Sequence, residues 1–497
     1  MKNFFYITTP IYYVNDKPHI GHAYTTILAD VLSRYNRQAN IETFFLTGLD
    51  EHGQKVQEAA YKLGIDPKSH CDKMAPRFTN LWDELYISND DFIRTTEERH
   101  KKVVKEILKT VMRNGDIYEA EYEGLYSVSE ERFITEKEAD SGAFRDIKTL
   151  NEKNYFFKMS KYQIKLIKHI KSNPNFIQPS HRKNEILGFL KKPLNDLCIS
   201  RPKSRLNWGI ELPFDKNYVT YVWFDALINY ITAAGYSSDK TLFKKLWPAS
   251  YHLIGKDILT THAVYWPTML MSAGIALPKS IFAHGWWLME DSKMSKSLGN
   301  IINPMDLIDE YGVDPVRYYL MREMVVGQDA NFTLESFIQR YNSDLANDFG
   351  NLLSRVTTLI NKNYSGEIPD PGKLSGQEFH IKEKSEHLFS FVKKLINDMK
   401  INEAIEEIMQ FIRHVNKYME QNEPWKMVKE NKLDAGKVLY AAGEALRIAA
   451  VLLSPIMPNR TSILLDTLNS KKDDFHWGGL PVGAKIKQHA PLFPRIK

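Results

Sequence analysis

Two histidines separated by two positions, His19 and His22, stand where a strand-like stretch of the chain gives way to a helical pattern. Gly21 between them has no Cβ, so the sugar or base of a nucleotide could approach its backbone closely. A helix that starts here directs its free N–H groups and its positive dipole end toward the same place, which favours phosphate. Both imidazoles could then donate hydrogen bonds to the oxygens of a pentavalent phosphorus, although two loop histidines alone would as often have a structural role.

Two lysines with the same spacing, Lys293 and Lys296, lie much later, among small hydroxyl and glycine residues at 292–299. Ammonium groups three residues apart in such a stretch make a mobile cationic loop, which could close on a triphosphate and leave with pyrophosphate. A Lys/Ser stretch alone is usually a solvated surface loop. Because the histidines follow the first predicted strand and the lysines follow the last, the two pairs together favour nucleotide chemistry.

The elements that must position these residues begin with a βαβ pattern. Residues 4–9 are aromatic and β-branched and predict a buried strand that stops at Pro10. Apolar residues recur every four positions between residues 21 and 35 and predict a helix. A second strand is predicted at 43–47, followed by a polar loop at 48–53. Parallel strands bind ligands at their carboxyl ends, so we expect a site in these loops.

The rest of the chain changes character twice. Residues 116–210 contain short aromatic pieces among acidic turns, which predicts an α+β module inserted between two halves of a parallel sheet. Sheet-like runs return at 218–223, 251–254 and 281–284, and from residue 342 onward the pattern is helical. The sequence therefore predicts an α/β domain with an insertion, followed by a helical region.

The composition is that of an ordinary globular chain. Of the 497 residues 12% are aromatic, which is enough for packed cores. Lys and Arg number 66 and Asp and Glu number 61, and this small positive excess permits a polyanionic partner without requiring one. Two distant cysteines, Cys71 and Cys198, argue against a disulfide framework and a cysteine-based zinc site. No run of about 18 apolar residues indicates a membrane span, and the strand predicted at the N-terminus leaves no room for a cleaved leader. We therefore expect a cytoplasmic protein.

The two spaced pairs together resemble the signature of the class I aminoacyl-tRNA synthetases, which is a HIGH-type tetrapeptide after the first strand and a KMSKS string after the last. Five longer strings resemble the methionyl-tRNA synthetases and follow one another in that family's order. These strings are residues 8–15, 46–53, 221–230, 254–258 and 262–267. The resemblance covers nearly the whole chain.

This resemblance implies an α/β fold in which a Rossmann-type parallel-sheet catalytic domain carries an inserted α+β connecting module and precedes an all-α anticodon-binding bundle. The expected parts are the first catalytic half (1–115), the connecting insertion (116–210), the second catalytic half (211–290), the KMSKS loop with the stem-contact region (291–345) and the helical anticodon-binding domain (346–497).

The resemblance also implies an activity. A methionine–tRNA ligase activates methionine with ATP to methionyl-adenylate and pyrophosphate, and then transfers methionine to the 3′ end of tRNA(Met). The expected partners are methionine, ATP with Mg²⁺ and tRNA(Met), without a membrane. Because no cysteine lies between Cys71 and Cys198, the chain resembles the branch without zinc knuckles, and no zinc is expected. No residues after Lys497 remain for an appended dimerising OB-fold, so we expect a monomer.

Carried over residue by residue, the methionine pocket would consist of Ile11, Tyr13, Asp50, Trp223, Ala226, Tyr230, Ile258, His262 and Trp266. Asp50, at a strand end, can pair with the substrate ammonium, and aromatic walls suit a polarisable thioether. Tyr230 and His262 could add a polar contact to the sulfur. Trp223 and Trp266 could equally be large apolar residues that pack a core.

The family pattern assigns a second set of residues to ATP. ATP would be bound by His19, Gly21, His22, Gly255, Asp257, Lys293 and Lys296, and four of these, His19, His22, Lys293 and Lys296, would be catalytic. Lys296 is the stronger candidate for steadying the transferring phosphate. Asp257 could instead be a simple helix N-cap.

The family pattern places the tRNA anticodon contacts in the helical region, at Asn351, Arg355 and Trp425. Asn351 can pair with a base edge, Arg355 lies one helical turn further on and can contact phosphate, and Trp425 offers a stacking platform. The alternatives are an ordinary surface charge for Arg355 and a packed core residue for Trp425.

Rivals inside the class can be tested against length and composition. Isoleucyl, valyl and leucyl enzymes need a long editing insertion, for which the 274 positions between His19 and Lys293 leave no room. Cysteinyl enzymes use a zinc site with cysteine ligands, which two scattered cysteines cannot supply. Two alternatives from other classes stay open, namely a catalytically inactive RNA-binding synthetase paralogue and a nucleotidyltransferase of the HIGH superfamily.

Overall fold

The structure is a computed structural model, and it describes residues 4–14, 17–127, 132–134, 139–140, 147–289, 292–293, 302–374, 376–471, 474–488 and 490–496. Contacts within the chain divide it into two compact units. The first unit comprises Met1–Pro18, Ile41–Leu81 and Ser88–Ala283, and the second comprises His19–Asn40, Trp82–Ile87 and His284–Lys497. The five-part division expected from the sequence is finer than these two units and stays a prediction.

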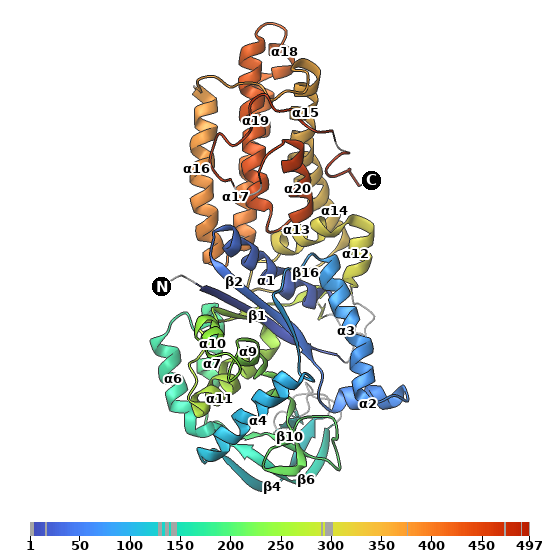
Figure 1. The fold of residues 1–497 in the computed structure, drawn as a ribbon, viewed down its shortest axis with the longest axis vertical. Coiled ribbons are helices and arrows are strands. Elements are labelled where there is room, and N and C mark those ends of the chain that lie inside the picture. Colours follow the sequence, from blue (N-terminus) through green and yellow to red (C-terminus); the bar gives the residue numbers. More distant parts are fainter. Residues whose placement is uncertain are drawn as a thin grey trace. The chain divides into compact units, whose positions relative to one another are not determined.

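The first unit is built on a six-stranded sheet with the order β3-β2-β1-β12-β13-β7. Every pairing whose register is described in this sheet is parallel, and Figure 1 shows β1 beside β2. The strands are β1 (Phe4–Tyr13), β2 (Glu42–Asp50), β3 (Asp91–Arg94), β7 (Ile177–Gln178), β12 (Tyr251–Gly255) and β13 (Ile281–His284). The parallel, Rossmann-type sheet expected from the sequence is confirmed.

The first strand is longer than the sequence predicts. We expected it to stop at Pro10, but β1 continues to Tyr13, and its register with β2 shifts between Thr8 and Ile11. Proline has no N–H to donate to the ladder, and an irregularity at that point lets the strand continue past it. As a result Tyr13 stands opposite Asp50, the last residue of β2.

The predicted sheet-like run at 218–223 is wrong in its second half. Strand β11 (Asp215–Thr220) ends before it and pairs antiparallel with β9 (Ser200–Pro202) and β10 (Glu211–Leu212), outside the parallel sheet. Trp223 lies in helix α8 (Val222–Ala226). A short apolar run does not distinguish a strand from a buried helix by periodicity, which explains the error.

The region predicted as an α+β insertion contains both kinds of element. An antiparallel sheet has the order β5-β4-β6-β8 and is followed by short helices. Its strands are β4 (Ile117–Ser127), β5 (Arg132–Ile134), β6 (Ile147–Phe157) and β8 (Leu197–Cys198), and the helices are η1 (Met159–Tyr162), α6 (Gln163–Ser172) and α7 (Ser180–Phe189).

Helices complete the first unit, and α4 shows why they form. Its buried residues recur at spacings of three and four, so that one face packs inward (His100, Val103, Val104, Ile107, Leu108 and Val111). The remaining elements are α2 (Gln54–Lys62), α3 (Pro67–Glu84, whose last turn belongs to the second unit), α4 (Glu98–Arg113), α9 (Asn229–Ala233), α10 (Lys240–Leu246), η2 (Lys256–Ile258), η3 (Thr261–Tyr265) and α11 (Trp266–Ala273).

The second unit combines the first helix with a small sheet and a helical bundle. Its elements are α1 (Ile20–Gln38), β14 (Trp287–Met289), β15 (Ser292–Lys293), α12 (Pro304–Tyr311), α13 (Val313–Glu323), β16 (Ala330–Asn331), α14 (Leu334–Arg340), η5 (Tyr341–Gly350), α15 (Asn351–Asn363), α16 (Gly376–Asn397), α17 (Ile401–Asn422), α18 (Pro424–Met427), α19 (Lys432–Leu453) and α20 (Pro458–Thr467). Helix α19 is buried on all sides from Val438 to Leu453 and contacts α15, α16, α17 and α20, so it is the centre of the bundle (Figure 1).

A fully buried arginine, Arg317 of α13, joins three parts of the second unit. Its Nη2 donates to Asp30 Oδ2 of α1 at 2.7 Å, its Nε donates to the carbonyl of Ile456 at 2.8 Å, and its Nη1 donates to the carbonyl of Leu85 at 2.8 Å. Since α1 begins at the HIGH-type residues, this arginine fixes the helix that carries them.

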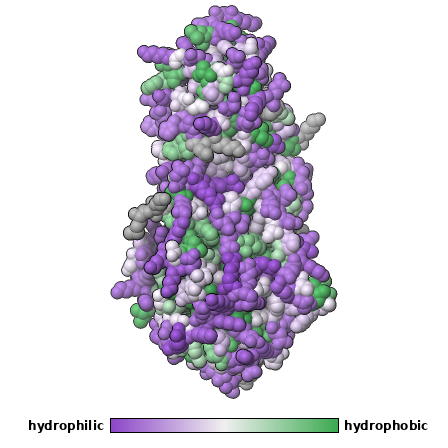
Figure 2. All heavy atoms as spheres, viewed as in Figure 1, coloured by the Kyte–Doolittle hydropathy of each residue, from purple (hydrophilic) through white to green (hydrophobic). Residues whose placement is uncertain are grey.

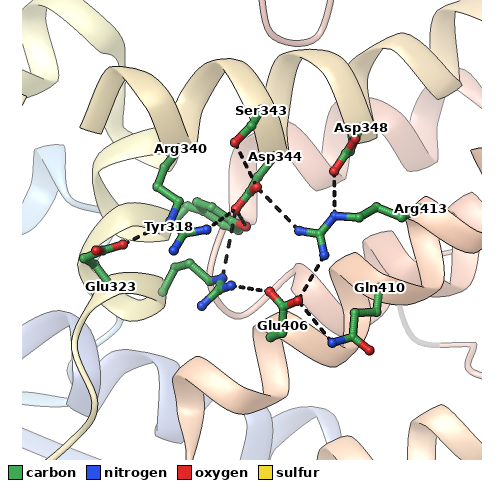
Figure 3. A network of polar contacts seen from close by, with 10 residues as sticks. Tyr318, Glu323, Arg340, Ser343, Asp344, Asp348, Glu406, Gln410 and Arg413 are labelled. Carbon is green, nitrogen blue, oxygen red and sulfur yellow. Dashed lines mark hydrogen bonds and ion pairs between the residues drawn. The ribbon is translucent and has the colours of Figure 1, made fainter. Parts of the chain in front are cut away.

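A second polar network links α13, η5 and α17 (Figure 3). The Tyr318 hydroxyl donates to Asp344 Oδ2 at 2.8 Å, and Arg413 contacts Asp348 Oδ2 at 2.9 Å and Glu406 Oε1 at 3.0 Å. Each carboxylate in it meets an arginine or a hydroxyl, so the charges on these three helices are compensated.

The face shown in Figure 2 is mainly hydrophilic, with apolar residues scattered over it. Some large apolar side chains, such as Ile164 and Leu433, are exposed, which is ordinary for a surface in contact with water. Within the ranges that the structure describes, no helix is both long enough and apolar enough to cross a membrane.

Candidate functional site

The residues expected to bind methionine all lie in the first unit, around the carboxyl ends of β1 and β2. Asp50 is the last residue of β2, is almost fully buried and stands opposite Tyr13 of β1. Trp223 and Ala226 lie on α8, and Ile258 ends η2 after β12. The carboxyl edge of a parallel sheet is where such folds bind ligands, so the predicted location fits the fold.

Tyr230 and His262 are joined by a hydrogen bond whose direction follows from their neighbours. His262 Nδ1 lies 3.0 Å from the carbonyl oxygen of Ile258, which only accepts, so Nδ1 carries a proton. Burial lowers the pKa of His262 to about 4, against the smaller opposing effects of the Ile258 carbonyl and of Asp257, so the ring is neutral at pH 7. Its Nε2 is then an acceptor, and the Tyr230 hydroxyl donates to it at 2.7 Å.

Aromatic rings surround this pair. The Tyr230 ring centroid lies 6.0 Å from that of Trp266, and the His262 ring meets Trp223 edge to face at 6.5 Å. Trp266 is fully buried and therefore also packs the core, whereas Trp223 is half-buried. An apolar wall with one oriented phenol suits an unbranched side chain that contains a polarisable sulfur.

His252 of β12 supports this wall and was missed in the sequence. Its Nε2 accepts the indole N–H of Trp266 at 3.3 Å, and its Nδ1 lies 2.8 Å from Thr8 Oγ1. Burial, with a smaller contribution from His262, lowers the pKa of His252 well below its usual range, so the ring is neutral and Nδ1 donates to Thr8. A histidine inside an apolar strand was the signal that could have revealed it.

Gly255 and Asp257, expected near the ribose, follow β12. Gly255 occupies the N-cap position of η2, and Asp257 is exposed in the first turn of that helix. The alternative that Asp257 is the helix N-cap is therefore wrong, because the capping position belongs to Gly255. Asp257 is an exposed carboxylate just after the carboxyl end of β12, and its expected contact with the ribose stays a prediction.

The HIGH-type residues form the first turn of α1, in the second unit. His19 is the N-cap, and its Nδ1 accepts the N–H of Gly21 at 3.1 Å, while His22 Nδ1 accepts the N–H of His19 at 3.2 Å. The two rings stack with centroids 3.8 Å apart. A Cβ on Gly21 would lie 2.9 Å from the His19 ring, which explains the glycine.

This capping arrangement determines which ring nitrogens donate. Both Nδ1 atoms accept backbone N–H groups, so the proton of each ring is on Nε2. Desolvation, together with the neighbouring His19, lowers the pKa of His22 well below its usual range, which makes it a neutral donor at pH 7. Two N–H donors on stacked rings at a helix N-terminus are suited to phosphate oxygens.

The two lysines of the KMSKS string are only partly described. Lys293 lies in β15, opposite Leu288 of β14 in the second unit, and the placement of its side chain is not described. Lys296 lies outside the described residues, so its expected role stays a prediction.

Two of the three expected anticodon residues are brought together in the helical bundle. The Arg355 guanidinium carbon of α15 lies 5.3 Å from the centroid of the Trp425 ring, at the start of α18. Trp425 is half-buried rather than a core residue, and Arg355 also lies 3.8 Å from Glu420. Asn351 is exposed one turn before Arg355 on the same helix, as predicted.

Models of two protein families match the chain, one over its N-terminal part and one over its C-terminal part. Residues 5–143 and 139–357 match "tRNA synthetases class I (M)", and residues 368–493 match the "anticodon binding domain of methionyl tRNA ligase". The protein is therefore a class I aminoacyl-tRNA synthetase. More particularly, the chain belongs to the methionyl-tRNA synthetase family, as the relatives below also indicate.

Curated relatives match over the whole chain. The chain is 46% identical to the methionine–tRNA ligase of Fusobacterium nucleatum, over 100% of its own length and 80% of that protein, and 44% identical to that of Rickettsia conorii, over 100% of both. It also resembles the structure of Mycobacterium tuberculosis methionyl-tRNA synthetase in complex with methionyl-adenylate, with a TM-score of 0.95, 38% identity and coverage of 99% and 100%.

The described residues contain no group of three or more His, Cys, Asp or Glu side chains that could hold a metal ion. Both cysteines are thiols in this structure, and Cys71 is buried. The absence of zinc expected from the sequence stays a prediction.

Proposed function

We propose that the chain ligates methionine to tRNA(Met) in two steps. In the first, a carboxylate oxygen of methionine attacks the α-phosphorus of Mg-ATP, and the bond between that phosphorus and the bridging oxygen breaks as pyrophosphate leaves. In the second, a terminal ribose hydroxyl of the tRNA attacks the carbonyl carbon of methionyl-adenylate and AMP leaves. No side chain acts as a covalent nucleophile, so catalysis is positioning and charge stabilisation.

The observation that carries this proposal is the oriented Tyr230–His262 pair within an aromatic wall, near the buried Asp50. Asp50 pairs with the substrate ammonium. The Tyr230 hydroxyl donates its hydrogen bond to His262 Nε2, so its oxygen lone pairs remain for weak contacts with the thioether. Ile11, Tyr13, Ala226 and Ile258 complete the walls.

For ATP, we propose that the Nε2–H groups of His19 and His22 and the N-terminus of α1 bind phosphate oxygens, while Gly255 and Asp257 meet the ribose. Lys293 and Lys296 would neutralise the charge that develops on pyrophosphate. A Lys296→Ala variant should then slow adenylate formation far more than it weakens methionine binding.

For tRNA, we propose that Trp425 stacks on an unpaired anticodon base, with Arg355 beside it and Asn351 at a base edge. The enzyme acts as a cytoplasmic monomer, and Mg²⁺ enters with ATP. The two alternatives are disfavoured because the relatives named above are ligases and because a nucleotidyltransferase would not need an anticodon domain.

Amino-acid-dependent ATP–pyrophosphate exchange tests the first step. Run in parallel with methionine, isoleucine, leucine, valine and cysteine, it should give exchange with methionine alone. Exchange with another amino acid would keep the class and overturn the pocket, and a folded chain without any exchange would support the inactive paralogue. Charging of tRNA(Met) by the same preparation tests the second step.

A further inference from the structure

A buried carboxylate between two imidazoles lies next to the amino-acid pocket, and the proposed reaction does not use it. Asp225 Oδ2 is 2.6 Å from His52 Nδ1, and Asp225 Oδ1 is 2.7 Å from His100 Nε2. Asp225 and His100 are 0% exposed, and His52 is 3% exposed. All three residues belong to the first unit.

The protons in this cluster are determined by its chemistry. Burial alone would raise the pKa of the Asp225 carboxyl, but the charges and hydrogen bonds of His52 and His100 outweigh burial and lower it to about 2. Asp225 is therefore a carboxylate that accepts on both oxygens, so His52 Nδ1 and His100 Nε2 carry protons. Charge-assisted hydrogen bonds of this kind are short and directional.

The two ends of the Asp225–His52 bond lie beside pocket residues in the chain. His52 follows Asp50 by two positions, in the loop after β2. Asp225 lies between Trp223 and Ala226 on α8. One hydrogen bond therefore ties the loop that directly follows Asp50 to the helix that supplies part of the aromatic wall.

The neighbours of His52 are held by other partners. The Glu51 carboxylate lies 2.6 Å from Arg94 Nε, and the N–H of Gly53 donates to the carbonyl of Trp208 at 3.3 Å. The His52 ring meets the Trp208 ring edge to face at 5.4 Å. These contacts hold the loop on both sides of His52, and the His52 side chain adds its hydrogen-bonded link to α8.

His100 provides a built-in comparison. It donates to the same carboxylate at nearly the same distance, but it comes from the first turn of α4 rather than from the loop that follows Asp50. Loss of either imidazole removes a buried, charge-assisted hydrogen bond and should destabilise the fold to a similar degree. Only the loss of His52 removes a link between α8 and the loop that follows Asp50.

We propose that Asp225, acting through His52, is a positioning residue for the ammonium end of the methionine pocket. This inference rests on the proposed role of Asp50 as the partner of the substrate ammonium. A displacement of about 1 Å in a group that positions the substrate can lower the reaction rate about 100-fold.

The test compares His52→Leu with His100→Leu by equilibrium binding of methionine and of its des-amino analogue, 4-(methylsulfanyl)butanoate, alongside thermal unfolding. We expect His52→Leu to raise the Kd for methionine at least tenfold and to leave the Kd for the analogue within twofold. His100→Leu should lower the unfolding midpoint similarly but leave the methionine Kd within threefold. His52→Asn, whose amide N–H can replace imidazole Nδ1, should restore methionine binding to within threefold of the wild type.

Equal losses of methionine affinity in the two leucine variants, or equal losses for methionine and its analogue, would overturn the inference in favour of a general structural role. If His52→Leu fails to fold, Asp225→Asn takes its place, because it keeps the side-chain shape and weakens the bonds to both imidazoles. A methionine Kd at least tenfold above that of the wild type, with the Kd for the analogue within twofold and the effect of His100→Leu within threefold, would support the inference, and a smaller rise would overturn it. A wild-type chain that lacks methionine-dependent exchange would overturn the proposed function, and this inference with it.

Discussion

At the scale of single residues, the direction of the Tyr230 hydrogen bond determines which atoms the proposed methionine pocket presents to the substrate sulfur. Because His262 Nδ1 is committed to the Ile258 carbonyl, the Tyr230 hydroxyl must donate to Nε2 and turns its lone pairs elsewhere. Tyr230→Phe removes the weak contact with the thioether and should raise the KM for methionine by about two- to tenfold, with little change in kcat. Norleucine, which lacks the sulfur, should be affected less. A larger effect on norleucine, measured by pyrophosphate exchange, would contradict a contact to sulfur.

The pKa of His262 makes a prediction about pH. It is lowered from about 6.5 to about 4, so the unfolded chain takes up a proton more readily than the folded one. The stability that depends on the neutral ring is therefore fully present above pH 6.5 and is lost as the pH falls toward 4. NMR of ¹³C-labelled histidine, assigned with His262→Gln, should show that this ring stays neutral from pH 8 to pH 5.5. A titration near 6.5 would refute the burial argument.

At the scale of elements, the strands and helices were more predictable than the contacts between them. The strand at 281–284 and the bundle stripe on α17 follow their patterns, whereas β1 continues beyond Pro10 because an irregularity absorbs the missing N–H. The two-residue strand β7 has too few residues for a pattern. The bond between His52 and Asp225 joins positions 173 residues apart, and nothing local to either one signals it.

Arg317 is the element-scale contact whose loss should cost most. Arg317→Met leaves the carboxylate of Asp30 buried without this partner and removes the donor from three buried carbonyls, which should cost about 3–5 kcal/mol. Thermal unfolding should begin several degrees lower in this variant. Lys487→Met, which breaks an exposed pair with Asp466, is the matched control and should cost less than about 1 kcal/mol. Equal shifts would show that burial is not the cause.

At the scale of the whole molecule, the two proposed steps draw on different sets of residues. The pocket around Tyr230 belongs to the first unit, and the Arg355–Trp425 contact belongs to the bundle of the second. Amino-acid activation needs no tRNA, so changes in the bundle should affect charging alone. The three anticodon contacts stay predictions, and the contact of Arg355 with the Trp425 ring could not be predicted from the sequence, since 70 residues separate them.

Trp425→Ala tests this separation of steps. Stacking of a base on an aromatic ring is worth about 1–3 kcal/mol, so kcat/KM for tRNA(Met) should fall about 10- to 100-fold while methionine-dependent pyrophosphate exchange stays within twofold of the wild type. Trp425→Phe keeps an aromatic face and should lose less than Trp425→Ala. Because Arg355 lies over the same ring, Arg355→Ala combined with Trp425→Ala should lose less than the sum of the two single effects. A fall in pyrophosphate exchange in Trp425→Ala or Arg355→Ala would mean that the bundle contributes to the first step. Additive losses in the double variant would mean that Arg355 and Trp425 contact the tRNA independently.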